Sequence, residues 1–255
     1  MDSPLLLNTR NLSKDFGGVR ALRDLDLDVR ERLIQAVIGP NGAGKTTLFN
    51  VISGVIAPTK GSVYFRDEEI TELPPHRIAH KGLTRTFQNL QLFADMTVLE
   101  NVMVGMHRRS RGGFFASALK TPWVMAEERR IRDESMEWLR FVGMEGHSAT
   151  VAGSLPFGNQ RILELARGLA SRPELLMLDE PAAGLNIRET QDLAQLIIRI
   201  KDSGVTVLLV EHDMELVMSV SDHVTVIDQG HKIAEGEPDS VRNDENVLKA
   251  YLGEE

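Results

Sequence analysis

The sequence predicts an α/β fold whose core is a mostly parallel sheet. An apolar run, Ala36–Ile38, leads directly into a glycine-rich segment at 39–47, which reads GPNGAGKTT. Further along, two short and continuous apolar runs, Leu175–Leu178 and Val205–Val210, have the composition of strands that are buried on both faces. Helical patterns separate these strands. Such alternation is typical of a parallel sheet, whose ligands bind at the carboxyl ends of the strands.

The remaining elements follow from the spacing of apolar residues. The first third of the chain reads mainly as strands, whereas residues 98–142 are mostly helix formers and predict a helical insert with a polar, basic interruption. In the last third, apolar residues recur at helical spacing between 193 and 200. The individual predictions are strands at Leu5–Leu7, Leu25–Val29, Gly61–Phe65 and Val224–Ile227, and helices at Pro75–His80, Leu193–Ile200 and Leu216–Val220.

Composition limits the class of protein. A chain of 255 residues with 42% hydrophobic content suits a globular protein with a sizeable core. The net charge of −8 argues against a nucleic-acid binder, which normally has a basic surface. No apolar run approaches the roughly 18 residues that cross a bilayer, and the acidic start shows no secretory signal. The absence of cysteine excludes disulfides and cysteine-ligated metals.

The glycine-rich segment has the spacing of a phosphate-binding loop, with Gly39 and Gly44 followed by Lys45 and Thr46. Its glycines let successive backbone N–H groups point at phosphate oxygens, and the helix that begins here directs its positive end to the same place. Lys45 supplies a charge to the outer phosphates, and Thr46 offers an oxygen to Mg²⁺. A plain glycine-rich turn is the alternative, but the flanking strand and helix favour nucleoside triphosphate binding. The predicted nucleotide-binding residues are Gly39, Pro40, Asn41, Gly42, Ala43, Gly44, Lys45, Thr46 and Thr47.

Polar residues follow two of the predicted strands. Asp179 and Glu180 come directly after Leu175–Leu178, and His212 follows Val205–Val210. Downstream of a phosphate-binding loop, a carboxylate at the tip of a buried strand is where Mg²⁺ is held. Asp179 is therefore predicted to serve the metal and Glu180 to polarise an attacking water, while His212 could reach the γ-phosphate and hold Glu180. The plainer interpretations are a pair of solvated acids and a structural histidine.

The order of the motifs resembles that of the ATP-binding subunits of ABC transporters, over nearly the whole chain. Phe16 stands where that family has an aromatic residue that stacks on adenine, and the loop at 39–46 matches its Walker A motif. Gln88 matches its Q-loop, and residues 175–180 match its Walker B motif. The other matches are the signature position at 155–160 (LPFGNQ), the D-loop at 183–186 (AGLN) and the switch histidine, His212.

The resemblance implies a P-loop NTPase fold with an N-terminal antiparallel β subdomain and an inserted α-helical subdomain. It implies one ATPase domain over 1–255, with the nucleotide-binding core in 1–88 and 161–255 and the helical and signature subdomain in 89–160. ATP and Mg²⁺ are the implied ligands. The implied catalytic residues are Glu180, His212, Gln88 and Lys45; Phe16 and Gly158 join the loop in binding nucleotide, and Thr46, Gln88 and Asp179 bind the metal.

Finer features are similar to the larger ATPase subunit of branched-chain amino-acid importers. They are the segments at 85–88 (RTFQ), 96–102 (MTVLENV) and 250–254 (AYLGE). Urea importers and other amide or amino-acid systems have similar subunits. The resemblance implies a second ATPase subunit, as a sister chain or a second copy, two membrane permease subunits and, indirectly, a solute-binding protein, with no nucleic-acid partner. It implies a peripheral position on the cytoplasmic face of the plasma membrane.

The signature segment departs from the common family form, Leu-Ser-Gly-Gly-Gln. The departures are Pro156, Phe157 and Asn159, and in the D-loop Asn186 stands where many relatives have aspartate. Proline offers neither a hydroxyl nor an N–H to phosphate, although it suits the start of a helix. Because Gly158 is retained, we expect the contact with nucleotide on the second subunit to persist through Gly158 and a helix that starts near residue 159, but to be weakened.

Two other classes of protein share part of the pattern. A soluble ABC-type ATPase of translation or DNA repair usually carries two such domains or long coiled coils and a basic surface, none of which is visible here. A P-loop kinase or GTPase would explain the loop but not Gln88, the signature region or His212.

The basic and aromatic residues of the helical insert predict either a solvated loop or a surface near lipid headgroups or the permease. These residues are Arg108, Arg109, Arg111, Phe114, Phe115 and Trp123.

Overall fold

The computed structural model describes residues 3–86, 90–106 and 122–252. The chain packs into two compact units, one formed by Met1–Arg85 and Glu174–Glu255 and the other by Thr86–Pro173. The subdomain limits expected from the sequence, with the helical part at 89–160, stay a prediction. Within the described residues, no helix is both long and apolar enough to cross a membrane.

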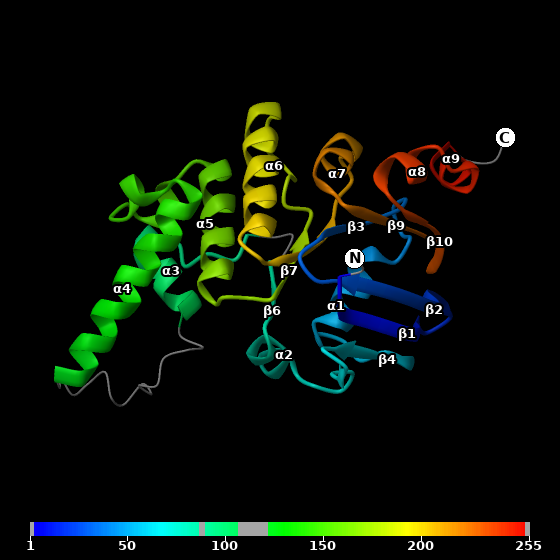
Figure 1. Ribbon diagram of the computed structural model, residues 1–255, viewed down its shortest axis with the longest axis horizontal. Coiled ribbons are helices and arrows are strands. Elements are labelled where there is room, and N and C mark those ends of the chain that lie inside the picture. Colours follow the sequence, from blue (N-terminus) through cyan, green and yellow to red (C-terminus); the bar gives the residue numbers. More distant parts are fainter. Residues whose placement is uncertain (1–2, 87–89, 107–121, 253–255) are drawn as a thin grey trace. The chain divides into compact units, whose positions relative to one another are not determined.

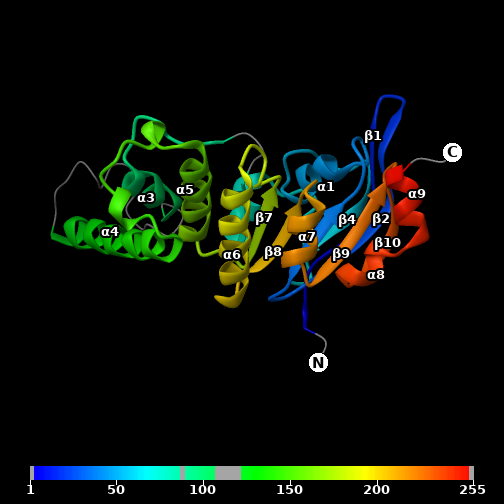
Figure 2. The same ribbon diagram turned by 90° about the horizontal axis from the view of Figure 1, so that it is seen from above.

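A six-stranded sheet forms the centre of the first unit. Its strands are β3 (Ile34–Ile38), β6 (Leu83–Arg85), β7 (Leu175–Asp179), β8 (Thr206–Val210), β9 (His223–Asp228) and β10 (His231–Gly236). Their order is β10-β9-β3-β8-β7-β6, and of these six only β10 is antiparallel to its neighbour. Figure 2 shows β7 and β8 side by side and pointing the same way. The predicted mostly parallel core sheet is confirmed.

Helices cover both faces of this sheet. They are α1 (Lys45–Ile52), α2 (Pro75–Lys81), α6 (Ile187–Asp202), α7 (Met214–Val220), α8 (Pro238–Arg242) and α9 (Glu245–Leu252). Figure 1 shows α6 and α7 on one side of the sheet and α1 on the other.

A capping box forms the start of α6. Asn186 Oδ1 accepts a hydrogen bond from the Glu189 amide, and the Glu189 carboxylate accepts one from the Asn186 amide. Asn186 thus has a local structural role.

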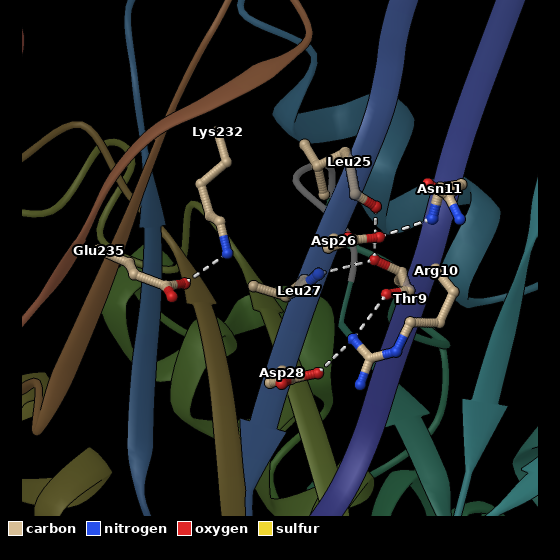
Figure 3. A network of polar contacts seen from close by, with 9 residues as sticks. All are labelled: Thr9, Arg10, Asn11, Leu25, Asp26, Leu27, Asp28, Lys232 and Glu235. Atoms are coloured by element: carbon tan, nitrogen blue, oxygen red, sulfur yellow. Dashed lines mark hydrogen bonds and ion pairs between the residues drawn. The ribbon is translucent and has the colours of Figure 1, made fainter.

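The N-terminal segment forms a separate antiparallel sheet. Its strands are β1 (Leu5–Phe16), β2 (Val19–Arg30), β4 (Lys60–Phe65) and β5 (Glu68–Glu69), in the order β2-β1-β4-β5. Figure 3 shows the polar contacts that join β1 to β2. The Thr9 hydroxyl donates to Leu25 O and accepts from the Leu27 amide, each at 2.9 Å, and Arg10 donates to Asp28 at 2.7 Å. The predicted antiparallel β subdomain is present.

The hydrophobic core of the first unit surrounds α1. Leu48 and Phe49 of this helix pack in one cluster with Phe65 of the antiparallel sheet and with Met177 and Leu208 of the parallel sheet. All five side chains are 2% exposed or less. Complete burial of each such side chain contributes on the order of 2 kcal/mol. The phosphate-binding loop is therefore anchored at its helical end in this hydrophobic core.

The second unit is helical, as predicted for the insert. It contains α3 (Val98–Met106), α4 (Pro122–Val142), α5 (Phe157–Ala170) and the short 3₁₀ helices η2 (Glu145–His147) and η3 (Ala152–Ser154). Helices α3 and α5 approach closely at Gly105, where an added Cβ would lie 2.1 Å from Arg167 O. Trp123 is exposed. Arg108, Arg109, Arg111, Phe114 and Phe115 lie outside the described residues.

Several element boundaries differ from the sequence predictions. The first two strands are longer than predicted, 12 residues each, because the added parts contain many polar residues and show no regular apolar alternation. Helix α5 begins at Phe157 rather than near residue 159, because Pro156 serves as its N-cap. The sequence patterns missed β6, β10, α8 and α9. Only three residues form β6, and β10 is half-buried without a regular pattern.

Candidate functional site

The predicted site residues of the first unit gather at one edge of the parallel sheet. Strand β8 lies between β3 and β7, and the three strands are parallel. Their carboxyl ends therefore meet at one edge. The loop at 39–47 follows β3, Glu180 follows β7, and His212 comes two residues after β8. This is the edge at which α/β sheets bind their ligands.

The backbone of the phosphate-binding loop requires glycine at specific positions. Gly44, the N-cap of α1, has φ 108°, and an added Cβ would lie 2.4 Å from Ala21 O. At Gly39 an added Cβ would lie 1.9 Å from Ile227 O in β9. Behind the loop, the Gly230 amide donates to Ala43 O at 2.9 Å. Strands β2, β9 and the turn after β9 thus fix the loop from behind.

Lys45 lies at the start of α1 with only 5% of its surface exposed. Its Nζ donates to Gly39 O at 2.7 Å and to Pro40 O at 3.0 Å. Burial lowers the pKa of Lys45, while the negative charges of Glu180 and Asp179 act in the opposite direction. The two carboxylates favour the charged form of Lys45. A buried ammonium group whose hydrogen-bond partners among the described residues are two neutral carbonyls is suited to an incoming phosphate anion.

The amino end of α1 adds further donors. No side chain caps this helix, so its first backbone N–H groups have no partner within the helix. Thr46 is exposed and Thr47 is half-buried. Asn41 and Gly42, at the tip of the loop, are also exposed. This donor set fits a polyphosphate, and the Thr46 hydroxyl together with the nearby carboxylates fits a hard divalent cation.

Glu180 and His212 are in direct contact. His212 Nε2 lies 2.6 Å from Glu180 Oε1, which is hydrogen-bond distance. The Glu180 backbone has φ 49°, a left-handed conformation that is uncommon for a residue with a side chain. Its amide donates to Val210 O at 2.9 Å, which ties it to the end of β8. The predicted pairing of these two side chains is present in the structure, whereas their chemical roles stay a prediction.

Two acidic neighbours fix the segment that carries His212. Glu211 is 4% exposed, and its carboxylate accepts from the Ala182 amide at 2.7 Å and from the His212 amide at 3.0 Å. Burial raises the pKa of Glu211, and these amide donors partly offset that effect. Asp213 caps α7 by accepting from the amides of two residues in its first turn. Glu211 therefore connects the segment after Glu180 to the segment that carries His212.

Two further predicted residues, Phe16 and Gly158, lie within the described residues, and a third does not. Phe16 ends β1 with 48% of its surface exposed, and Lys14 Nζ lies 5.1 Å from its ring centre. An exposed ring of this kind is available for stacking. Gly158 is buried in the first turn of α5, in the second unit. Gln88 lies outside the described residues.

Three residues of the site had no predicted role. Arg85 forms a buried ion pair with Asp179. Glu211 accepts the backbone bonds described above, and the phenol of Tyr251 in α9 accepts a hydrogen bond from the Gly39 amide. No local sequence pattern signals Arg85 or Glu211, because β6 has only three residues and Glu211 is one of several acidic residues that follow an apolar run. Only the resemblance of the 250–254 ending pointed to Tyr251.

The comparison with known families decides the class of this site. The sequence profile of the ABC transporter family matches residues 22–183. The chain belongs to the ABC transporter family. A second profile, described as the branched-chain amino acid ATP-binding cassette transporter, matches residues 231–255, a range that contains β10, α8 and α9.

Individual members of the ABC transporter family cover the whole chain. The chain is 48% identical to the high-affinity branched-chain amino acid transport ATP-binding protein BraF of Pseudomonas aeruginosa, over 98% of both chains. It is 44% identical to LivG of Escherichia coli, a protein of the same description, over 100% of both chains. Among solved structures it matches MJ1267, an ATP-binding cassette of an ABC transporter in its ADP conformation, with TM-score 0.86 and 33% identity. That match covers 99% of this chain and 100% of the other.

These findings confirm the family and the fold predicted from the motifs. The chain is an ABC-type ATPase with the P-loop NTPase fold.

A surface pocket of about 410 Å³ between α6 and α7 is lined by residues such as Leu185, Thr190 and Leu216. None of the predicted nucleotide-binding residues lines it. The predicted site therefore stays at the edge of the sheet described above, apart from this pocket.

Proposed function

We propose that this chain is the ATP-hydrolysing subunit of an importer for branched-chain amino acids. The contact that supports hydrolysis most directly is the 2.6 Å pair of Glu180 and His212 beside the phosphate-binding loop. The substrate class is supported by the names of the relatives, which transport branched-chain amino acids, and by the matching C-terminal profile. Related systems for urea, amides or other amino acids are the alternative for the substrate.

Lys45 and the loop amides bind and orient the triphosphate in this proposal. Lys45 exchanges its bonds to the loop carbonyls for bonds to phosphate, and the unsatisfied amides of α1 supply further donors. The ring of Phe16 stacks on adenine. Thr46, Gln88 and Asp179 would hold Mg²⁺, and the ion would supply positive charge that neutralises the phosphate oxygens.

Glu180 acts as the base for the attacking water. Its carboxylate accepts a hydrogen bond from that water and takes up the proton as the water oxygen bonds to the γ-phosphorus. The bond from this phosphorus to the β–γ bridging oxygen breaks, and ADP leaves. The left-handed backbone at Glu180 and the contact with His212 hold the carboxylate in one orientation. The nearby ammonium of Lys45 stabilises negative charge that develops on the terminal phosphate.

One chain supplies only part of the groups that the reaction needs. We propose that the amino end of α5, with Gly158, binds the nucleotide held by a second ATPase subunit, either a sister chain or a second copy. Two membrane permease subunits would bind this pair at the cytoplasmic face of the membrane, and a solute-binding protein would deliver the substrate to them. The net charge of −8 supports the absence of a nucleic-acid partner.

A transport experiment in the native host tests this function. The gene for this chain is deleted, and uptake of radiolabelled leucine and of radiolabelled urea is measured with and without a plasmid copy. The proposal expects leucine uptake to fall on deletion and to return with the wild-type copy but not with Glu180→Gln. Unchanged leucine uptake together with a loss of urea uptake would reject the proposed substrate class. A detergent pull-down that recovers no membrane permease would reject the transport role.

A further inference from the structure

The first unit contains a buried ion pair that the mechanism above does not use. Arg85, the last residue of β6, donates from Nη2 to Asp179 Oδ2 at 2.6 Å. The side chains are 5% and 3% exposed, respectively. Strands β6 and β7 are neighbours, with Arg85 opposite Met177, so the arginine reaches forward along β7 to the carboxylate. Asp179 is the residue that is expected to serve the metal.

The guanidinium of Arg85 is also held from α1. Nη1 donates to Asn50 Oδ1 at 2.8 Å and to Ser53 Oγ at 3.0 Å. The guanidinium carbon lies 5.6 Å from the ring centre of Phe49, a cation–π distance. Helix α1 is the helix that begins at the phosphate-binding loop. Arg85 thus connects the Asp179 carboxylate to the helix that carries Lys45.

We propose that Arg85 is a positioning residue, which fixes the orientation of the Asp179 carboxylate so that Mg-ATP binds with full affinity. The inference rests on the proposed function. A short charged hydrogen bond to one oxygen restrains rotation of the carboxylate about its Cβ–Cγ bond. Partners that orient a metal-binding carboxylate typically contribute about 10-fold to 100-fold to metal affinity or activity.

The residue type supports orientation rather than simple charge balance. A buried carboxylate needs a cation nearby, and lysine would satisfy that need as a point charge. Arginine has a rigid planar fork, and here the fork spans acceptors on two elements, with Nη2 on Asp179 and Nη1 on Asn50 and Ser53. An Arg85→Lys variant keeps the charge but cannot reproduce this geometry, so it separates the two roles.

Binding measurements on the purified full chain test the proposal. ATP affinity is measured by calorimetry in EDTA and in saturating Mg²⁺, and the Mg²⁺ concentration for half-maximal thermal stabilisation is measured at fixed ATP. For Arg85→Lys we expect ATP affinity in EDTA within about twofold of wild type, and a rise of about tenfold in the Mg²⁺ requirement. Asn50→Ala removes one hydrogen-bond acceptor of the guanidinium but no buried charge. It should also raise the Mg²⁺ concentration for half-maximal stabilisation, by a smaller factor than Arg85→Lys. Lys201→Arg is the control, because Lys201 pairs with Asp222 at 3.0 Å, away from the loop.

An unchanged Mg²⁺ requirement in folded Arg85→Lys and Asn50→Ala would overturn the positioning role, even if wild type binds Mg-ATP normally. An equal loss of ATP affinity in EDTA and in Mg²⁺ would also overturn it, because a purely structural defect is independent of the metal. Failure of the wild-type chain to bind Mg-ATP would instead reject the proposed function, and the inference with it. A thermal unfolding curve for each variant shows whether it is folded, and Asn50→Ala alone decides the question if Arg85→Lys unfolds.

Discussion

We expect nucleotide affinity to depend most on Lys45. Its ammonium is already buried and bonded to two loop carbonyls, so little reorganisation is needed when phosphate replaces them. We predict that Lys45→Ala weakens ATP binding about 100-fold, or about 3 kcal/mol, since hydrogen bonds to charged groups contribute about 1.5–3 kcal/mol each. Calorimetric titration measures the change. Affinity within about threefold of wild type would contradict the prediction.

The role proposed for Glu180 is different, so its substitution should affect turnover rather than ATP binding. Glu180→Gln keeps the size of the side chain and a contact with His212 but cannot accept a proton. We predict nearly normal Mg-ATP binding and a turnover rate at least about 100-fold lower, the usual contribution of a general base. Phosphate release measured beside ATP binding tests this. Turnover like that of wild type would remove Glu180 from the catalytic role.

The site could be predicted from the sequence where its residues are contiguous or follow recognisable strands. The loop at 39–47 carries its chemistry in consecutive residues, and Glu180 and His212 each follow a buried apolar run. Arg85 was not predictable in this way, because its partner Asp179 is 94 residues away and the two meet only through pairing of β6 with β7. Glu211 reads as one of several acidic residues until the structure shows its bonds to backbone amides.

At the scale of elements, the junction of β3 and the phosphate-binding loop depends on a close approach to β9. An alanine Cβ at Gly39 would lie 1.9 Å from Ile227 O, whereas one at Gly42 would meet nothing within 4 Å. Both glycines have positive φ, 155° and 83°, so both substitutions carry backbone strain. We predict that Gly39→Ala lowers the free energy of unfolding by about 3 kcal/mol and Gly42→Ala by about 1 kcal/mol. Urea unfolding curves measure both, and equal losses would refute the close approach.

The start of α5 is the element most affected by the unusual signature. Pro156 is the N-cap, with no side-chain hydrogen bond to the first turn, and the Gln160 amide donates to Pro156 O at 3.0 Å. A serine here could cap the helix and offer a hydroxyl to phosphate. We predict that Pro156→Ser speeds ATP hydrolysis severalfold in the assembled transporter and raises α5 stability by about 1 kcal/mol. An unchanged or slower rate in reconstituted vesicles would contradict it.

Elements with strong periodicity were predicted and elements without it were missed. The stripe of Leu193, Leu196, Ile197 and Ile200 predicted α6 because one face of that helix is buried. Helices α8 and α9 are short, with mixed burial, and β10 is half-buried. These elements are fixed by packing, with β10 and α8 against β9 and α9 against β10, and by contacts such as that of Tyr251 with Gly39. A local sequence pattern cannot reveal such contacts.

At the scale of the whole molecule, the two units carry different parts of one proposed reaction. The first unit holds the phosphate loop, Asp179, Glu180 and His212, and the second holds Gly158. Because Glu180→Gln should retain ATP without hydrolysing it, we predict that this variant, mixed with its partner subunit and Mg-ATP, elutes as a stable dimer. Wild type, which turns over its ATP, should elute mainly as separate subunits. Size-exclusion chromatography with light scattering measures both, and a monomeric variant would argue against the two-subunit site.

The central claim is that the glycine-rich loop binds Mg-ATP on the folded chain. Calorimetric titration of the purified protein with Mg-ATP tests it most directly, with Lys45→Ala as the matched control and a thermal unfolding curve to show that both are folded. The account predicts saturable uptake of one nucleotide per wild-type chain, and stabilisation of about 2.7 kcal/mol at 100 times the dissociation constant. A folded wild-type chain that takes up no Mg-ATP, or that binds it no better than Lys45→Ala, would contradict the account.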